Sequence, residues 1–336
     1  MPKSIDLALQ GGGSHGAFTW GVLERLLEDD RIKIEALCGT SAGAMNAAML
    51  AYGMQQGGRQ GAIDLLRRFW KKISDQQNFA LLQPSAADRL YGNGNMHYSP
   101  LYWFFNALSK VYSPYQLNPQ DINPLKDILL ELIDFDKLRS CKVTKLFVCA
   151  TNVKTSRAKV FNLKEMSINA LLASACLPYV FKAIEINGEH YWDGGFMGNP
   201  PIFPLIDNTN SEDILLIQIN PIEIDKVPTS AEEITDRMNE LSFNSSLMHE
   251  MRRVNFVSKM LERGFDMDGV VRKLFIHNIN PQKEMAKLGV SSKLNADWHF
   301  INQLRMTGRE MAQNWLDQNY DKIGKESTCD IQSVFL

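Results

Sequence analysis

The chain has 336 residues, of which 45% are hydrophobic and 22% charged, and its formal net charge is −2 at pH 7. These values are ordinary for a globular protein, and the near-neutral balance excludes an overall electrostatic footprint of nucleic-acid binding. No apolar run reaches the ~18–20 residues of a membrane span, and no cleavable signal peptide is visible at the N-terminus. We therefore expect a cytoplasmic protein without a nucleic-acid partner, any membrane contact being peripheral.

Strands and helices alternate in the first part of the chain. Residues 5–10 are a strand candidate that leads into a glycine-rich loop, and residues 17–28 have the apolar spacing of a helix. A second strand is expected at 34–38, followed by a second glycine-containing turn, a small-residue helix at 44–52 and another helix at 62–73. This order predicts a three-layer α/β/α fold with a central, mostly parallel sheet.

The regular pattern stops between residues 78 and 120 and resumes beyond them. The later elements expected are helices at 123–133, 167–176, 232–263 and 298–320 and strands at 145–153, 159–163, 183–186, 190–192, 214–219 and 274–279. We expect one domain: residues 1–225 would form its α/β part, with 78–120 inserted as an aromatic segment. Residues 226–336 would be a helical C-terminal region packed on the same domain.

Gly39-Thr40-Ser41-Ala42-Gly43 joins the second strand to the small-residue helix. A serine on such a tight turn is held in a strained conformation, and Gly39 and Gly43 leave room for neighbouring backbone. The N-terminal end of the following helix favours negative charge at the hydroxyl. The pattern predicts a nucleophilic Ser41, although a serine that only caps a helix would have the same local sequence.

The loop Gly11-Gly12-Gly13-Ser14-His15-Gly16 joins the first strand to the first helix. Its backbone N–H groups are suited to an anion, which would be either a dinucleotide pyrophosphate or the oxyanion of acyl transfer. The dinucleotide pattern requires an acidic residue at the end of the next strand, where this chain has Gly39-Thr40-Ser41. Parallel strand ends meet at one sheet edge, so the loop next to Ser41 is expected to form an oxyanion hole.

Asp193-Gly194-Gly195 follows a hairpin whose turn is Asn187-Gly188. A carboxylate on a turn with glycines can approach another loop closely. Taken alone, however, Asp-Gly usually marks an ordinary turn.

Together, residues 11–16, 39–43 and 193–195 resemble the patatin-like phospholipase family, whose members have a Gly-Gly-Gly-x-Arg/Lys-Gly loop, a Gly-x-Ser-x-Gly turn and a distant Asp-Gly-Gly or Asp-Gly-Ala in this order. The resemblance covers residues 5–220 and implies a patatin-like fold and a serine lipid acyl hydrolase of the phospholipase A type. It implies a lipid or other acyl-ester substrate and no metal or organic cofactor. Protein partners stay unknown.

The resemblance also implies a Ser–Asp dyad in place of a triad. Ser41 would attack the ester carbonyl and form an acyl-enzyme, and Asp193 would act as general base. The oxyanion would be held by the backbone at Gly11, Gly12, Gly13 and Ser14. Residues that support these motifs are His15, Gly16, Gly39, Gly43, Gly194 and Gly195.

His15 stands where the family usually has Arg or Lys, so the chain lacks the expected loop cation. A histidine with an ordinary pKa of ~6.5 is only partly charged near neutral pH. We consider two roles for His15: a pH-sensitive part of the oxyanion site, or a purely structural residue, which we favour.

Two other functions are left open at this point. The first is an α/β-hydrolase esterase with a Ser–His–Asp triad, in which Asp207 or Asp266 would precede His277 or His299. The second is a non-catalytic lipid-binding module on a hydrolase scaffold.

The aromatic segment 78–120 also has two interpretations. It is either a cap that lines an acyl-chain pocket or contacts a membrane, or an ordinary packing insertion. The odd number of cysteines and the absence of a CxxC pair predict no disulfide framework and no zinc site.

Overall fold

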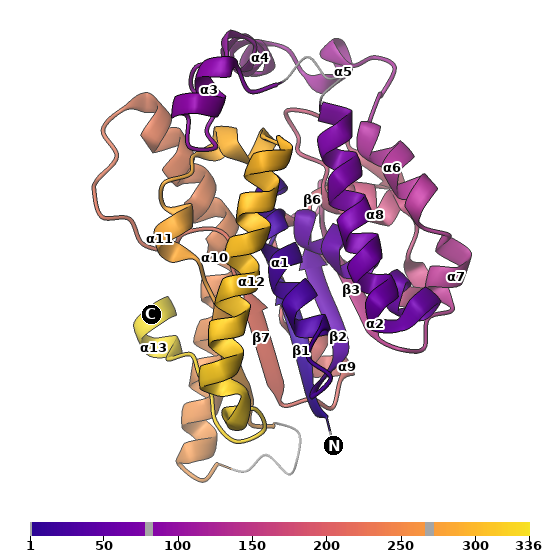
Figure 1. The fold of residues 1–336 in the computed structure, drawn as a ribbon, viewed down its shortest axis with the longest axis vertical. Coiled ribbons are helices and arrows are strands. Elements are labelled where there is room, and N and C mark those ends of the chain that lie inside the picture. Colours follow the sequence, from indigo (N-terminus) through magenta and orange to yellow (C-terminus); the bar gives the residue numbers. More distant parts are fainter. Residues whose placement is uncertain (1, 78–82, 266–271) are drawn as a thin grey trace.

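The computed structural model describes residues 2–77, 83–265 and 272–336. In these residues one eight-stranded sheet forms the centre of the molecule (Figure 1). Its strands are β1 (Lys3–Leu9), β2 (Ile32–Thr40), β3 (Lys145–Asn152), β4 (Ala158–Asn162), β5 (Ile184–Ile186), β6 (Glu189–Asp193), β7 (Asp213–Ile217) and β8 (Phe275–Ile279). The strand order is β5-β6-β3-β2-β1-β7-β8, with β4 also paired to β3. β3, β2, β1, β7 and β8 run parallel to their neighbours in this order, whereas β4, β5 and β6 are antiparallel.

Helices account for most of the remaining chain. The α-helices are α1 (Gly16–Leu27), α2 (Ala42–Gln77), α3 (Ala86–Tyr91), α4 (Pro100–Val111), α5 (Pro114–Leu117), α6 (Pro124–Leu132), α7 (Phe135–Arg139), α8 (Ile168–Ser174), α9 (Phe203–Asn208), α10 (Ala231–Glu262), α11 (Gln282–Met285), α12 (Trp298–Asn319) and α13 (Ile331–Phe335). The 3₁₀ turns are η1 (Gly13–His15), η2 (Leu163–Glu165), η3 (Gly194–Phe196), η4 (Val290–Leu294) and η5 (Tyr320–Lys322).

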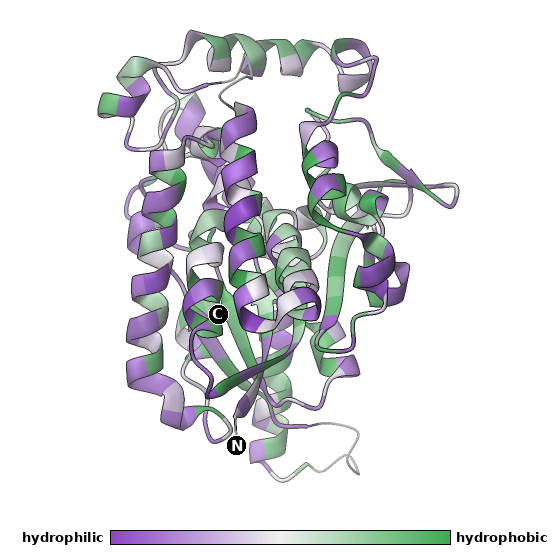
Figure 2. Cartoon of the chain, turned by 45° about the vertical axis from the view of Figure 1, so that its right-hand side comes forward, coloured by the Kyte–Doolittle hydropathy of each residue, from purple (hydrophilic) through white to green (hydrophobic). Residues whose placement is uncertain are grey.

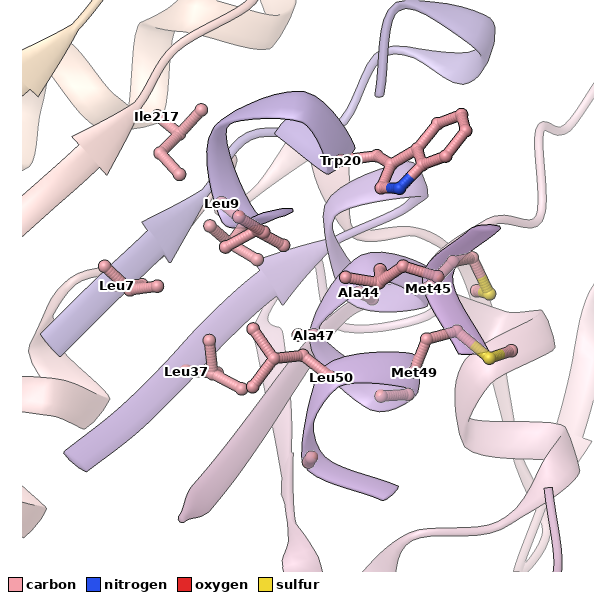
Figure 3. Close-up of a cluster of buried hydrophobic side chains, with 14 of the residues drawn as sticks. Leu7, Leu9, Trp20, Leu37, Ala44, Met45, Ala47, Met49, Leu50 and Ile217 are labelled. Atoms are coloured by element: carbon pink, nitrogen blue, oxygen red, sulfur yellow. The ribbon is translucent and has the colours of Figure 1, made fainter. Parts of the chain in front are cut away.

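The two faces of the sheet belong to two separate cores, because successive side chains of a strand point to opposite faces. On β1, Leu7 and Leu9 belong to the core formed with α1, α2, α8 and α12, and Figure 3 shows them beside Leu37 of β2 and Leu50 of α2. Ala8, between them, belongs to the other core with residues of α9, α10 and α13. The fold is therefore three-layered, as predicted.

The helix after Ser41 is longer than expected. The sequence predicts separate helices at 44–52 and 62–73, and the structure has one element, α2, that is broken where Gly57 and Gly58 leave helical geometry. The first part is rich in alanine and lies against β2, so its backbone comes close to the sheet, as Figure 3 shows for Ala44 and Ala47.

The core on this face contributes strongly to stability. Replacing a fully buried core residue such as Leu37 of β2 by alanine would lower the free energy of unfolding by ~2–5 kcal/mol.

The expectation of an irregular segment at 78–120 is wrong for much of its described part, because α3, α4 and α5 lie there; residues 78–82 lie outside the described residues. Ser85 and Ser99 cap the N-termini of α3 and α4 with their side chains. The three helices lie at the top of the molecule, and α4 shows much hydrophobic colour in Figure 2. Its exposed side chains include Trp103 and Phe104.

The C-terminal residues contribute to both the sheet and its covering. β8 extends the sheet beyond β7, and α12 packs along α1 (Figure 1). Ile301 and Leu304 of α12 belong to the same core as Leu9. No helix in the described part of the chain is long and apolar enough to cross a bilayer.

Candidate active site

Ser41 lies at the turn between β2 and α2 in a strained conformation. Its φ is +53°, in the left-handed region that costs non-glycine residues energy unless the surroundings enforce it. Two contacts hold the turn: the Ser41 N–H donates to Ser174 Oγ at 2.9 Å, and the Ser41 carbonyl accepts from the Met45 N–H at 3.1 Å. Ser41 is only 8% exposed, so little of this residue is open to solvent.

β3 places Asp193 beside this turn. In β3, Cys149 pairs with Thr40, the last residue of β2. The next residue of β3, Ala150, pairs with Asp193 at the end of β6. The Thr151 hydroxyl donates to the Asp193 carbonyl at 2.8 Å, and the Asp193 N–H donates to the Cys176 carbonyl at 2.8 Å. Strand pairing thus brings together two residues that are 152 positions apart in the sequence.

The Asp193 side chain is completely buried and only half satisfied. Its Oδ1 accepts the Gly195 N–H at 2.7 Å, whereas Oδ2 has no hydrogen-bond partner among the described residues. Burial raises the pKa of Asp193 to about 6, and this rise is opposed by the Gly195 N–H, the nearby Ser41 hydroxyl and the charge of Lys293. The Ser41 hydroxyl is thus one of the groups that favour the ionised form of the Asp193 carboxylate.

The glycine-rich loop lies directly over Ser41. A Cβ at Gly11 would be 2.7 Å from Ser41 Cβ and 2.6 Å from the Thr40 carbonyl oxygen, so only glycine allows this approach. The Gly11 N–H is engaged, because it donates to Asn199 Oδ1 at 2.7 Å. The N–H groups of Gly12, Gly13 and Ser14 have no acceptor among the described residues.

The other motif glycines also lie at contacts between these segments. Gly16 faces Ala42, Gly39 faces Gly43, Gly43 faces the carbonyls of Leu9 and Gln10, Gly194 faces Cys149 and Thr40, and Gly195 faces the Phe243 ring. The structure therefore brings all three sequence motifs together at the carboxyl ends of β1 and β2.

The comparisons with known proteins agree with this arrangement. The family model described as patatin-like phospholipase matches residues 7–206, more than half of the chain and all three motifs. The chain belongs to the patatin-like phospholipase family. This is a family of lipid acyl hydrolases, as the resemblance of the motifs implies. No curated protein is similar enough to be counted as a relative.

Two solved structures have some similarity to this patatin-like chain. VipD from Legionella pneumophila gives a TM-score of 0.39 at 15% identity, covering 99% of this chain and 78% of VipD. The heterodimeric ExoU–SpcU complex from the type III secretion system of Pseudomonas aeruginosa gives 0.32 at 21% identity, covering 75% of this chain and 52% of the matched one. At these scores neither structure bears on the residues of the site.

His15 departs from the patatin-like pattern, and the structure buries it. It is 1% exposed; Nε2 lies 2.7 Å from Ser292 Oγ, and Nδ1 has no partner within the described part of the chain. Burial, and secondarily the charge of Lys293, lowers the pKa of His15 to about 3. This lowered pKa favours a neutral ring at physiological pH, which supports the structural role over the pH-sensitive one.

Several polar residues around the site were not found from the sequence. Ser174, Asn199, Asn220 and Lys293 contact the motifs from α8, two connecting segments and η4. Only Ser174 had a signal in the sequence, because it is a small polar residue at the end of a mostly apolar helix. Isolated asparagines and a lysine outside any periodic pattern give no signal in a single sequence.

Within the described part of the chain, no hydrogen bond joins Ser41 to a residue of the alternative triad. Both ring nitrogens of His277 are engaged, by Thr328 Oγ1 and Asp213 Oδ1 at 2.9 Å each, and β1 and β7 separate its strand from β2. His299 is at the start of α12, where its Nε2 lies 3.0 Å from Gln303. Asp207 is exposed on α9, and Asp266 lies outside the described residues.

Proposed function

We propose that this patatin-like protein hydrolyses carboxylic esters of lipids, as a phospholipase A-type enzyme, through a Ser41–Asp193 dyad. Ser41 Oγ attacks the ester carbonyl while its proton passes to the free Oδ2 of Asp193. The protonated Asp193 then donates this proton to the leaving alcohol as the C–O bond breaks. Water attacks the acyl-enzyme, gives its proton to Asp193, and Ser41 regains a proton when the fatty acid leaves.

The N–H groups of Gly12, Gly13 and Ser14 are the proposed donors to the oxyanion. They have no acceptor among the described residues, and they belong to the loop that touches Ser41. We give Gly11 a different role, because its N–H is bound to Asn199: it lets the loop approach Ser41. Loss of one direct donor in such a site typically costs ~3–4 kcal/mol of barrier.

One observation carries the proposal: a fully buried carboxylate with a free oxygen lies beside a strained serine under a glycine loop. A buried carboxylate with one unpartnered oxygen lowers stability, and groups of this kind gather at functional sites. Accepting the serine proton is a use that the geometry supports. The pKa of about 6 suits a base that is ionised at neutral pH and can still carry a proton transiently.

The test is hydrolysis of p-nitrophenyl butyrate and of phosphatidylcholine vesicles by Ser41→Ala and Asp193→Asn. Both variants are expected to lose at least about 10³-fold in kcat, on the scale of a missing nucleophile or base. Ser74→Ala is the matched serine control, since Ser74 is a buried residue of α2, the helix that follows Ser41, and its hydroxyl has no partner among the described residues. Asp225→Asn is the matched carboxylate control on the surface.

Two results would contradict this mechanism. Activity retained in Asp193→Asn but lost in His277→Gln would establish a triad despite the separation of His277 from Ser41. Lipid binding without any hydrolysis, and without covalent labelling of Ser41 by a fluorophosphonate, would establish a non-catalytic lipid-binding module.

A further inference from the structure

Lys293 lies against the oxyanion loop although it is 280 residues away from Gly13 in the sequence. Gly13 has a φ of +60°, and a Cβ there would lie 2.3 Å from the Lys293 carbonyl oxygen. The preceding residue, Ser292, lies 2.7 Å from His15 Nε2. η4 therefore closes on η1 through both backbone and side chains.

The Lys293 ammonium connects to the loop through an asparagine. Nζ donates to Asn220 Oδ1 at 2.9 Å and to Asn239 Oδ1 at 2.7 Å. Asn220 is buried, and its Nδ2 donates to the Gly11 carbonyl at 2.8 Å. The Asn220 N–H is itself fixed, because it donates to Gln10 Oε1 at 2.8 Å. The result is a continuous chain of hydrogen bonds from a cation to the peptide between Gly11 and Gly12.

That peptide has two ends. Its carbonyl accepts from Asn220, and its N–H is the Gly12 donor proposed for the oxyanion. A hydrogen bond to the carbonyl end of an amide polarises the unit and makes its N–H a stronger donor, and a charged group at the start of the chain increases the effect. The fixed amide also needs no reorientation when negative charge develops.

We propose that Lys293 is a positioning residue for the hydrolysis: acting through Asn220, it orients and polarises the Gly11–Gly12 peptide and supplies a positive charge to the loop. This inference rests on the proposed function. It assigns to η4 the cation that the patatin-like pattern places in the loop itself. Phe243, whose ring centroid is 5.2 Å from Nζ, helps to hold the ammonium in place.

The positive charge of Lys293 is lost at alkaline pH. Burial lowers its pKa to about 8, opposed by Glu240 and Asp236 of α10 and by Asp193. The fourth titratable group that faces it, His15 of η1, is neutral. The ammonium is therefore present below about pH 8 and is lost as the pH rises above it, so kcat is expected to fall on the alkaline side.

The test compares Lys293→Met, Lys293→Arg and the exposed-lysine control Lys283→Met with p-nitrophenyl butyrate from pH 6 to 10. Lys293→Met is expected to lower kcat about ten- to a hundredfold at pH 7, less than the ~10²–10³ of a direct donor, with KM nearly unchanged and no alkaline fall. Lys293→Arg should keep most of the activity, and its alkaline fall should also vanish because arginine stays charged. Lys283→Met should match the wild type.

The inference is wrong if Lys293→Met keeps the wild-type kcat, or if the alkaline fall persists in Lys293→Arg. The arginine variant decides the case if the methionine variant fails to fold. Failure of the proposed function looks different: wild type would show no hydrolysis, or Ser41→Ala would keep it. A further check combines Lys293→Met with Asn220→Leu. The double variant should lower kcat no more than the more damaging of the two single changes, because both changes break the same chain of hydrogen bonds.

Discussion

Asn199 Oδ1 accepts a hydrogen bond of 2.7 Å from the backbone N–H of Gly11. This contact joins the segment after Asp193-Gly194-Gly195 to the loop over Ser41, so the two halves of the site are fixed to each other. Asn199 is fully buried, and its own N–H donates to Ser246 Oγ at 3.1 Å. The contact also selects the donors, because it removes one of the four expected N–H groups from the oxyanion site.

Asn199→Ala is expected to lower both activity and stability. The change leaves the Gly11 N–H buried without an acceptor, which costs about 1–3 kcal/mol of unfolding free energy, and it allows the loop to move away from Ser41. We expect kcat to fall about tenfold or more, for a loss of about 1.4 kcal/mol or more of transition-state stabilisation. Urea unfolding and ester hydrolysis measure the two effects. Asn208→Ala, on the surface at the end of α9, is the control; a fully active Asn199→Ala would show that the loop holds its position without this contact.

The acid side of the pH profile should report Asp193. Burial raises the pKa of its carboxyl to about 6, and only the ionised form accepts the Ser41 proton. Activity is therefore present above about pH 6 and is lost as the pH falls through this value, about tenfold in kcat/KM for each further pH unit. The measurement is kcat/KM from pH 4.5 to 7.5, with circular dichroism at each pH as a control for folding. Constant kcat/KM down to pH 4.5 would exclude Asp193 as the base.

Asp193→Asn is expected to stabilise the protein while it abolishes hydrolysis. A carboxyl whose pKa is about 6 when folded and near 3.8 when unfolded is ionised in the fold at a cost of about 3 kcal/mol at neutral pH. An amide at this position avoids the cost and can still accept the Gly195 N–H. The gain should be complete above about pH 6 and should shrink as the pH falls towards 4, where wild-type Asp193 is protonated in the fold. Urea unfolding of both proteins at pH 7.5 and pH 4.5 tests this sign; an equal difference at both pH values would contradict it.

His15→Gln should leave the shape of the pH–rate profile unchanged between pH 5 and 8. The pKa of His15 is lowered to about 3, so the wild-type ring does not titrate in this range. An amide can preserve a hydrogen bond to Ser292, and a modest loss of kcat that is equal at every pH would agree with a structural role. A shift of either limb of the profile would show that His15 carries charge during the reaction.

The sequence was sufficient to place the motif residues that depend on local geometry. Ser41 and the glycine loop follow β2 and β1, which end side by side, and Asp193 follows a hairpin, so short stretches predicted where they lie; their catalytic roles stay predictions. It was also sufficient for the layers, because Leu7, Ala8 and Leu9 form the continuous apolar run of a strand covered on both faces.

The parts that escaped prediction depend on distant contacts or on overlooked capping signals. Nothing in the sequence near Lys293 or Asn220 distinguishes them from surface residues, because the partners of their side chains are more than 50 positions away. The helix α4 was missed for another reason: its aromatic residues concealed Ser99-Pro100, an N-cap followed by proline in the first turn, which is a standard helix start. The exposed aromatic side chains of α4 agree with a cap over the site and with an ordinary packing insertion. Both interpretations of residues 78–120 therefore stay predictions.

The position of β1 has a consequence for how the protein must be made. This strand leaves the ribosome before the other strands of its sheet. One of its two neighbours, β7, ends only at Ile217, and α12, which covers α1, comes later still. The side chains of Leu7 and Leu9 are therefore not fully buried until these later segments have been synthesised. A fragment that stops at residue 206, where the family match ends, would lack β7, β8 and α12 and is expected to aggregate when expressed alone, although it contains Ser41 and Asp193.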